Sequence, residues 1–201
     1  RWENEEERTA AVYYDAKDIP QGFLLYWVEE DVFHIREMVY LTQEARKGLW
    51  NFIRAHYSMI DAVKGHIYTG EPLAFLLDES QIQETIEPYF MARIVDVAQF
   101  LRLYPFEGSI RPFHFVVTDP MAEWNNGIFS VATDREGTVS VTDEPAGKAV
   151  ELDIQTLSAM LKGYKRPSYL ARIERLHTDK RTLRLLEEII PDGQPYFSDY
   201  F

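Results

Sequence analysis

Residues 41–50 read Leu-Thr-Gln-Glu-Ala-Arg-Lys-Gly-Leu-Trp, or LTQEARKGLW, and join a strand-like run to a helix-like run. The run before them, 32–41, alternates so that one face is fully apolar, which is typical of a half-buried strand. The run after them, 49–57, has apolar side chains at helical spacing. A loop between a strand and a helix N-terminus is a ready anion site, because free backbone N–H groups and the helix dipole point at it.

The loop has the spacing of a phosphate-binding loop but lacks one of its glycines. Gln43 and Gly48 stand where a loop of the form Gln/Arg-x-x-Gly-x-Gly/Ala has them, whereas Arg46 replaces the first glycine. Glycine lets backbone amides approach a diphosphate closely, and a side chain at this position blocks the approach. Leu49 and Trp50 add bulk where the helix should open. We therefore expect a loop that does not hold a nucleotide cofactor.

Strands surround this unit in the left half of the chain. Thr42 is the expected cap of the central helix, and a turn is expected at 18–20. The remaining elements expected here are strands at 9–15, 22–29 and 59–67, a turn with a short helical or extended piece at 68–80, and an extended segment at 82–91.

The pattern changes after residue 91, and we place a domain boundary near residue 90. Asp96 is expected to cap a helix, Asn125-Asn126-Gly127 to form a hairpin turn, and Gly163 to end a helix. Ser168 is the expected cap of the next helix, and Thr178 or Asp179 that of the last. The segments expected as strands are 111–119, 128–134, 138–144 and 148–153, and those expected as helices are 97–103, 154–162, 168–176 and 180–190.

Composition limits the possible classes of protein. The chain has 201 residues, a net charge of −12 and no cysteine. The acidic balance argues against nucleic acid and anionic membranes as partners, and it fits a cationic substrate. The absence of cysteine excludes disulfides and thiol catalysis and suits a cytoplasmic protein. The five histidines fall in no metal-ligand spacing, so we expect no metal site.

Strand, loop, amphipathic helix and strand across 32–67 resemble the central unit of GNAT acetyltransferases. Together with the second half, the chain resembles the C-terminal part of the Eis-type ("enhanced intracellular survival") acetyltransferases. The similar segments, in chain order, are ARKGLWNFIRAHYSMIDAVKGHI, EPLAFLLDES, MARIVDVAQFL, VELDIQTLSAMLKGY and a chain end in Phe. Met91 departs from the family, which often has Trp there. The fold class implied is α+β: a degenerate GNAT-like mixed sheet with one main helix, then a sterol-carrier-like antiparallel sheet packed with helices.

The resemblance also implies which domains this chain contains and which domain binds the cofactor. Residues 1–90 would be a partial second GNAT-like domain without a cofactor loop, and 91–201 a sterol-carrier-protein-like domain. The acetyl-CoA-binding domain would lie before Arg1, so this chain would be a piece of a longer N-acetyltransferase, inactive alone and without a cofactor of its own. The substrates implied are aminoglycoside-like polyamines or lysine side chains, and the assembly is a homo-hexamer.

Acetyl transfer requires the attacking amine to lose a proton. By the resemblance, the base is the terminal carboxylate of Phe201. Asp199 and Asp96 are candidates for holding a polycationic substrate, and Tyr200 and Met91 complete the candidate substrate-binding set. Asp96 is expected to act mainly as a helix cap and to pair with Arg93.

Two other functions remain open from the sequence. A sterol-carrier-like module would bury a lipid or another hydrophobic ligand between its sheet and its helices, whereas a scaffold would only organise oligomers of the catalytic domain. Apolar stripes would line the lipid site, although such stripes more often simply fill a core. The residues concerned are Phe113, Phe115, Val117, Leu157, Met160 and Leu161.

Overall fold

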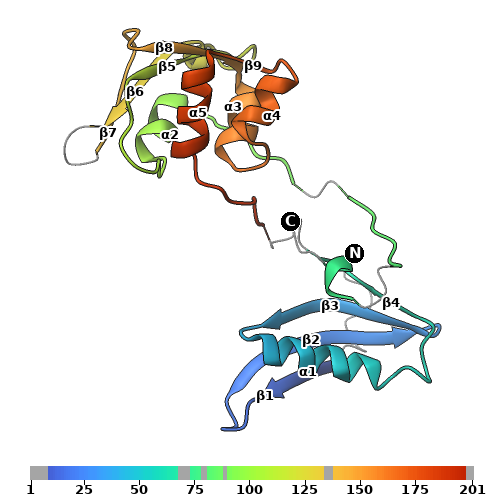
Figure 1. Cartoon of the computed structure of the whole chain (residues 1–201). Helices are drawn as coiled ribbons and strands as arrows, with labels where there is room; N and C mark the ends of the chain where they lie inside the picture. Colours follow the sequence, from blue (N-terminus) through green and yellow to red (C-terminus); the bar gives the residue numbers. More distant parts are fainter. Residues whose placement is uncertain (1–8, 68–72, 78–80, 88–89, 134–137, 198–201) are drawn as a thin grey trace. The chain divides into compact units, whose positions relative to one another are not determined.

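The computed structural model describes residues 9–67, 73–77, 81–87, 90–133 and 138–197. The chain divides into two compact units, Arg1–Glu71 and Pro72–Phe201 (Figure 1). Each unit has its own sheet and its own buried core. The boundary that we expect near residue 90 stays a prediction.

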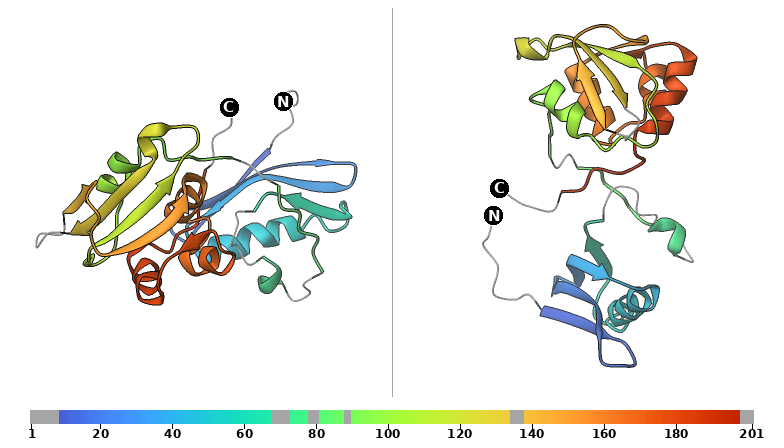
Figure 2. Two further views of the ribbon diagram at one scale, coloured as in Figure 1. Left: turned by 90° about the horizontal axis from the view of Figure 1, so that it is seen from above. Right: turned by 90° about the vertical axis from the view of Figure 1, so that its left-hand side faces the viewer.

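The first unit is a four-stranded sheet with the order β1-β2-β3-β4 and one helix, α1. The first three strands are antiparallel, and β4 runs parallel to β3, so α1 is the crossover between them. Figures 1 and 2 show α1 lying along one face of this sheet. The bounds are β1 Thr9–Tyr14, β2 Pro20–Glu29, β3 Val32–Tyr40, α1 Gln43–Arg54 and β4 Ala62–Gly65.

The core of this unit lies between the helix and the sheet. Leu24, Phe33 and Ile35 from the strands are buried against Leu49 and Ile53 of α1. The two helical positions are four apart and therefore lie on one face of α1. The amphipathic stripe expected from the sequence thus packs on the apolar face expected of the strand 32–41.

The second unit is a five-stranded sheet with the order β7-β6-β5-β8-β9. Its helices α2 to α5 lie on one face of this sheet (Figure 1). The strand bounds are β5 Phe113–Thr118, β6 Gly127–Thr133, β7 Val139–Thr142, β8 Lys148–Asp153 and β9 Leu176–His177. The helix bounds are η1 Ala74–Leu76, α2 Val97–Leu103, η2 Glu123–Asn125, α3 Ile154–Leu161, α4 Pro167–Arg172 and α5 Lys180–Ile189.

The α+β class is confirmed, with helices packed on the sheet as expected. The expectation of an antiparallel second sheet is wrong, because β8 runs parallel to β5. The chain reverses twice between β5 and β7, then crosses back to place β8 on the free side of β5, and β9 adds an antiparallel edge. The second sheet is therefore mixed.

The core of the second unit is built from the stripes noted in the sequence. Phe113, Phe115 and Val117 of β5 and Leu157, Met160 and Leu161 of α3 all belong to one buried cluster. Each of them is at most 4% exposed. They pack with one another and with their neighbours, so these side chains fill the core of the unit.

The helix caps follow local chemistry, with one exception. Thr42, Asp96 and Asp179 accept hydrogen bonds from the first turns of α1, α2 and α5. Ser168 does not cap α4, because this helix begins one residue earlier at Pro167, whose missing N–H and fixed φ suit a first helical position. Among the described residues no helix reaches the length and apolar character needed to span a bilayer.

Candidate functional site

The stretch 43–48 is helical, which corrects the expectation of a loop. Strand β3 ends at Tyr40 and α1 begins at Gln43, so only Leu41 and Thr42 connect them. Thr42 Oγ1 accepts a hydrogen bond from the backbone N–H of Ala45 at 3.1 Å. The chain turns straight from the strand into the helix, and this short connection leaves no glycine-rich loop to surround a diphosphate.

A carboxylate lies in the first turn of α1. Glu44 is the acidic residue of that turn. Burial, followed by the hydrogen bond to Glu44, raises the pKa of Tyr13, which lies on β1. The negative charge of Glu44 interacts favourably with the helix dipole and repels an anion that approaches this helix end. The side-chain cap and the carboxylate therefore both compete with a phosphate at this helix end.

Gly48 lies where α1 crosses strand β1. A Cβ atom added to Gly48 would lie 2.3 Å from both Cδ2 and Cε2 of Tyr13. Real Cβ atoms do not approach other atoms so closely, so the aromatic ring occupies the space that a side chain would need. The glycine that matches the cofactor-loop pattern is thus explained by helix–sheet packing.

Arg46 lies on the same helix and contacts its neighbours. Its Nη1 donates a hydrogen bond to Gln43 Oε1 at 3.4 Å, and its guanidinium carbon is 5.9 Å from the centroid of the Tyr40 ring. Within the described part of the chain its Nε is buried without a hydrogen-bond partner. This side chain therefore packs beside the strand end and along α1.

Asp96 and Met91 are the two candidate substrate residues that the structure describes. Asp96 is the N-cap of α2 and accepts a hydrogen bond from the Gln99 backbone N–H at 2.8 Å. Met91 is 96% exposed. Neither fact tests a role in substrate binding, which stays a prediction for both. The other candidates, Asp199, Tyr200 and Phe201, lie outside the described residues.

The expectation that Arg93 pairs with Asp96 is wrong, because Arg93 forms its ion pair with Asp119. Its Nη2 donates to Asp119 Oδ2 at 2.5 Å, and the Asp119 side chain is fully buried. Asn125 Nδ2 also donates to Asp119 Oδ2, at 2.9 Å. The backbone N–H groups of Met121 and Ala122 donate to the other oxygen. Every lone-pair direction of this carboxylate is thus used by a hydrogen bond or an ion pair.

These contacts set the acidity of the Asp119 carboxyl. Burial by itself raises the pKa, but the hydrogen bonds from Asn125, Met121 and Arg93 and the charge of Arg93 outweigh it and lower the pKa to about 2. Asn125 also accepts from the Val97 backbone N–H and donates to the Val95 carbonyl. The cluster therefore fixes the segment that leads into α2 onto the turn after β5.

Sequence reasoning missed this cluster, although part of its signal was visible. The sequence Asn-Asn-Gly favours a hairpin turn, so it predicts that Asn125 and Asn126 are turn residues. In the structure both asparagines instead hydrogen-bond through their side chains to the Asp119 region. An aspartate and two asparagines within eight residues, directly after a strand, were the available signal. No group of three or more acidic or histidine side chains among the described residues lies close enough together to hold a metal ion.

Comparison with family models divides the chain in the same order as the resemblance. Residues 1–94 match the acetyltransferase (GNAT) domain. Residues 97–198 match the sterol carrier protein domain. No curated protein matches the chain.

Several solved structures are similar to this chain over most of its length. A conserved protein from Enterococcus faecalis V583, described as a probable N-acyltransferase, matches with TM-score 0.88 and 31% identity over 96% of this chain and 50% of its own. A GCN5-related N-acetyltransferase from Anabaena variabilis ATCC 29413 matches with TM-score 0.77 and 27% identity over 96% of this chain and 50% of its own. Eis1 from Mycobacterium abscessus matches with TM-score 0.69 and 20% identity over 90% of this chain and 48% of its own, which shows a shared fold alone.

The chain thus spans about half the length of the solved structures that it matches. The match to the sterol carrier protein domain covers just over half of the chain. The chain therefore belongs to the sterol carrier protein domain family, and the residues that precede this domain match the GNAT acetyltransferase domain.

Proposed function

We propose that this chain is the C-terminal part of an Eis-type, acetyl-CoA-dependent N-acetyltransferase that acts on amines. The observation that carries the proposal is the match to the Enterococcus faecalis protein, described as a probable N-acyltransferase, at 31% identity over 96% of this chain and only 50% of that protein. Both units of this chain match, and as much sequence again remains in the relative. The proposal assigns the cofactor-binding domain to that other half.

The N-terminus of α1 supports this assignment. GNAT acetyltransferases use acetyl-CoA, whose diphosphate needs free backbone N–H groups at a helix N-terminus. In this chain the connection is only Leu41-Thr42, the first turn is capped by Thr42, and Glu44 adds a negative charge. These residues do not fit the diphosphate, so no step of the reaction is assigned to this unit.

The acceptor is an amine that arrives as a cation, such as an aminoglycoside-like polyamine or a lysine side chain. A net charge of −12 raises the local concentration of cationic molecules near the surface. The amine becomes nucleophilic only after it loses a proton, and the terminal carboxylate of Phe201 is the proposed acceptor of that proton. Asp199, Tyr200, Met91 and Asp96 are the proposed walls of the substrate pocket, and a cytoplasmic homo-hexamer is the proposed assembly.

The role of the terminal carboxylate can be tested in the longer protein that includes the upstream domain. Adding one glycine after Phe201 moves the carboxylate by one residue, whereas adding the same glycine at the N-terminus leaves it in place. We expect the C-terminal extension to lower the rate of thiol release from acetyl-CoA with an aminoglycoside by about 100-fold or more, the usual contribution of a general base. Equal rates for the two extended proteins would contradict the role of Phe201.

Lipid binding is the alternative function, and the core argues against its simplest form. The six apolar residues that would line a lipid site are buried against one another in a single cluster. Native mass spectrometry of the purified chain tests this alternative directly. A co-purifying lipid at one per chain would favour a binding module over an acetyltransferase part.

A further inference from the structure

A pocket of about 290 Å³ lies on the first unit, where strands β2, β3 and β4 run side by side. Phe33 and Ile35 of β3 are buried in the core beneath α1. Because side chains alternate along a strand, His34 lies on the opposite face of the sheet. Figures 1 and 2 show no helix of this unit on that face. The pocket is therefore separate from the helix end at which a cofactor was tested.

Strand pairing gathers the polar side chains of this pocket. Strand β4 runs parallel to β3, and Lys64 is the register partner of His34. Paired residues of neighbouring strands point to the same face, roughly 5 Å apart. Arg36 and His66 each follow two residues later on their own strand and also line the pocket. One arginine, one lysine and two histidines thus surround a single space.

An aromatic ring holds one of the two imidazoles in place. Trp27 of β2 is the register partner of His34, and the two rings stack with centroids 4.7 Å apart and planes 5° apart. Within the part of the chain that the structure describes, neither His34 nor His66 has a hydrogen-bond partner for its ring, and no carboxylate pairs with Lys64. Both rings and the ammonium can therefore donate to a ligand.

The pocket concentrates positive charge in an acidic protein. The chain has a net charge of −12, yet among the described residues no carboxylate lines this pocket. A phosphate group carries about −1.5 to −2 charges and three strong acceptor oxygens. A guanidinium and an ammonium neutralise such a charge, and the guanidinium can bind two of its oxygens at once. A carboxylate, with one charge and two oxygens, would leave part of this set unused.

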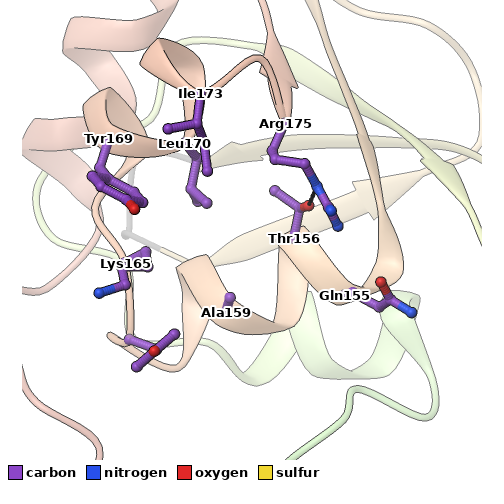
Figure 3. Close-up of a pocket in the computed structure, with 9 residues that line it drawn as sticks. Gln155, Thr156, Ala159, Lys165, Tyr169, Leu170, Ile173 and Arg175 are labelled. Carbon is purple, nitrogen blue, oxygen red and sulfur yellow. Dashed lines mark hydrogen bonds between the residues drawn. The ribbon is translucent and has the colours of Figure 1, made fainter.

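The pocket of the second unit, between α3 and α4, has a different arrangement of charge (Figure 3). Figure 3 shows Lys165 at one end and Arg175 at the other. Arg175 Nη2 donates to Asp153 Oδ2 at 2.8 Å, so a carboxylate already neutralises this cation. The two cations do not converge on one anion. This second pocket is therefore an internal control for the first.

We propose that the pocket of the first unit binds the doubly charged phosphate group of a small molecule. Arg36 and Lys64 would neutralise the phosphate, and the imidazoles of His34 and His66 would donate hydrogen bonds to its remaining oxygens. The Trp27 ring would contact the organic part of a phosphate monoester. This inference does not depend on the proposed acetyl transfer, because no step of that reaction is assigned to the first unit.

The test is an NMR titration of the ¹⁵N-labelled 201-residue chain with phenyl phosphate, at constant ionic strength. We expect saturable shifts of the amides of residues 33–37 and 62–66, with a dissociation constant on the order of 1 mM. Phenyl sulfate has the same shape but a single charge and should bind about tenfold more weakly. Absence of saturable shifts there, shifts confined to residues 155–175, or equal affinity for the two compounds would overturn the proposal.

Inorganic phosphate identifies the source of the phosphate group. An affinity equal to that of phenyl phosphate would indicate free phosphate as the ligand. A weaker affinity would indicate a monoester, because free phosphate lacks the contact with the Trp27 ring. Either result supports a phosphate site in this pocket.

Matched variants locate the charge. Lys64→Gln removes the exposed ammonium of the pocket and should weaken binding of phenyl phosphate about tenfold, whereas Lys64→Arg should retain most of it. Lys47→Gln removes the same charge from an exposed position on α1, which packs on the other face of the sheet. This control should bind like the unaltered chain. Equal affinity of Lys64→Gln and Lys47→Gln would show that the phosphate does not bind at this pocket.

Discussion

Gly48 sits beneath the ring of Tyr13, where α1 crosses the first strand. The same glycine matches one position of a cofactor-loop pattern, and the sequence alone does not distinguish the two explanations. A glycine needed for a close approach between a helix and a strand looks the same as one needed beside a phosphate. The distinction depends on Tyr13, which is far away in the sequence and therefore absent from any local motif.

A double-mutant cycle tests the packing explanation. Gly48→Ala should destabilise the first unit by about 1–3 kcal/mol, because the new Cβ overlaps the Tyr13 ring. In a Tyr13→Ala background the same change should stabilise by about 0.5–1 kcal/mol, the usual gain of alanine over glycine in a helix. Urea denaturation of the four proteins gives the free energies of unfolding. An equal cost of Gly48→Ala in both backgrounds would be inconsistent with this contact.

Asp119 gives a prediction about pH. Its pKa is lowered from 3.8 to about 2 in the folded chain. The folded state therefore binds a proton less readily than the unfolded state, and the carboxylate contributes its full stability above about pH 4. This contribution should decline as the pH falls from 4 towards 2. Urea midpoints of the second unit should drop over this window, and less steeply for Asp119→Asn. Parallel declines for the two proteins would argue against Asp119 as a source.

At the scale of elements, the hairpin between β2 and β3 has an unusual turn. Glu30 and Asp31 connect the strands as a two-residue loop, with φ angles of 49° and 59°. Two-residue hairpin loops of this kind favour Asn-Gly because both residues have positive φ. Non-glycine residues are strained in this region. Both side chains are exposed, and Asn-Gly would fit the backbone conformation of this turn better than Glu-Asp.

Replacing Glu30-Asp31 by Asn-Gly should stabilise the first unit by about 1 kcal/mol. The control is Lys17→Gly, which places a glycine in another exposed turn of the same unit, at a residue without positive φ. This control should destabilise slightly, because glycine adds freedom to the unfolded chain. Thermal unfolding followed by circular dichroism measures both. A decrease in stability of the Asn-Gly protein would show that the turn is not strained.

Local chemistry predicted three of the helix caps and most elements, whereas pairing between distant strands was not predictable. Each of these helices begins with a side chain whose oxygen accepts a hydrogen bond from a backbone N–H two or three residues later, so the cap depends on local sequence alone. The capping residues are Thr42, Asp96 and Asp179. The parallel pairing of β8 with β5 depends on which strand edge is left free after the meander closes. The sequences of β5 and β8 do not show which edge of β5 is left unpaired, so the pairing could not be predicted from either strand alone.

At the scale of the whole molecule, the order of a GNAT-like and a sterol-carrier-like domain could be predicted, but the polar cluster around Asp119 could not. The α+β class followed from the resemblance of the segments to a GNAT-like and a sterol-carrier-like domain. The cluster joins the neighbouring Asp119 and Asn125 to Arg93, which is separated from them in the sequence by α2 and β5. Its existence depends on the folding of the whole second unit, so the expected pair of Arg93 with Asp96 was the nearest local alternative.

The most direct test of the account is a titration of the ¹⁵N-labelled chain with coenzyme A, followed at the amides of residues 41–48. The account predicts no saturable shifts there at concentrations that saturate a GNAT enzyme, because α1 begins directly after a two-residue connection and its first turn is capped by Thr42. Saturable shifts of these amides, lost on adding excess pyrophosphate, would contradict the assignment of the cofactor to the other half of the protein.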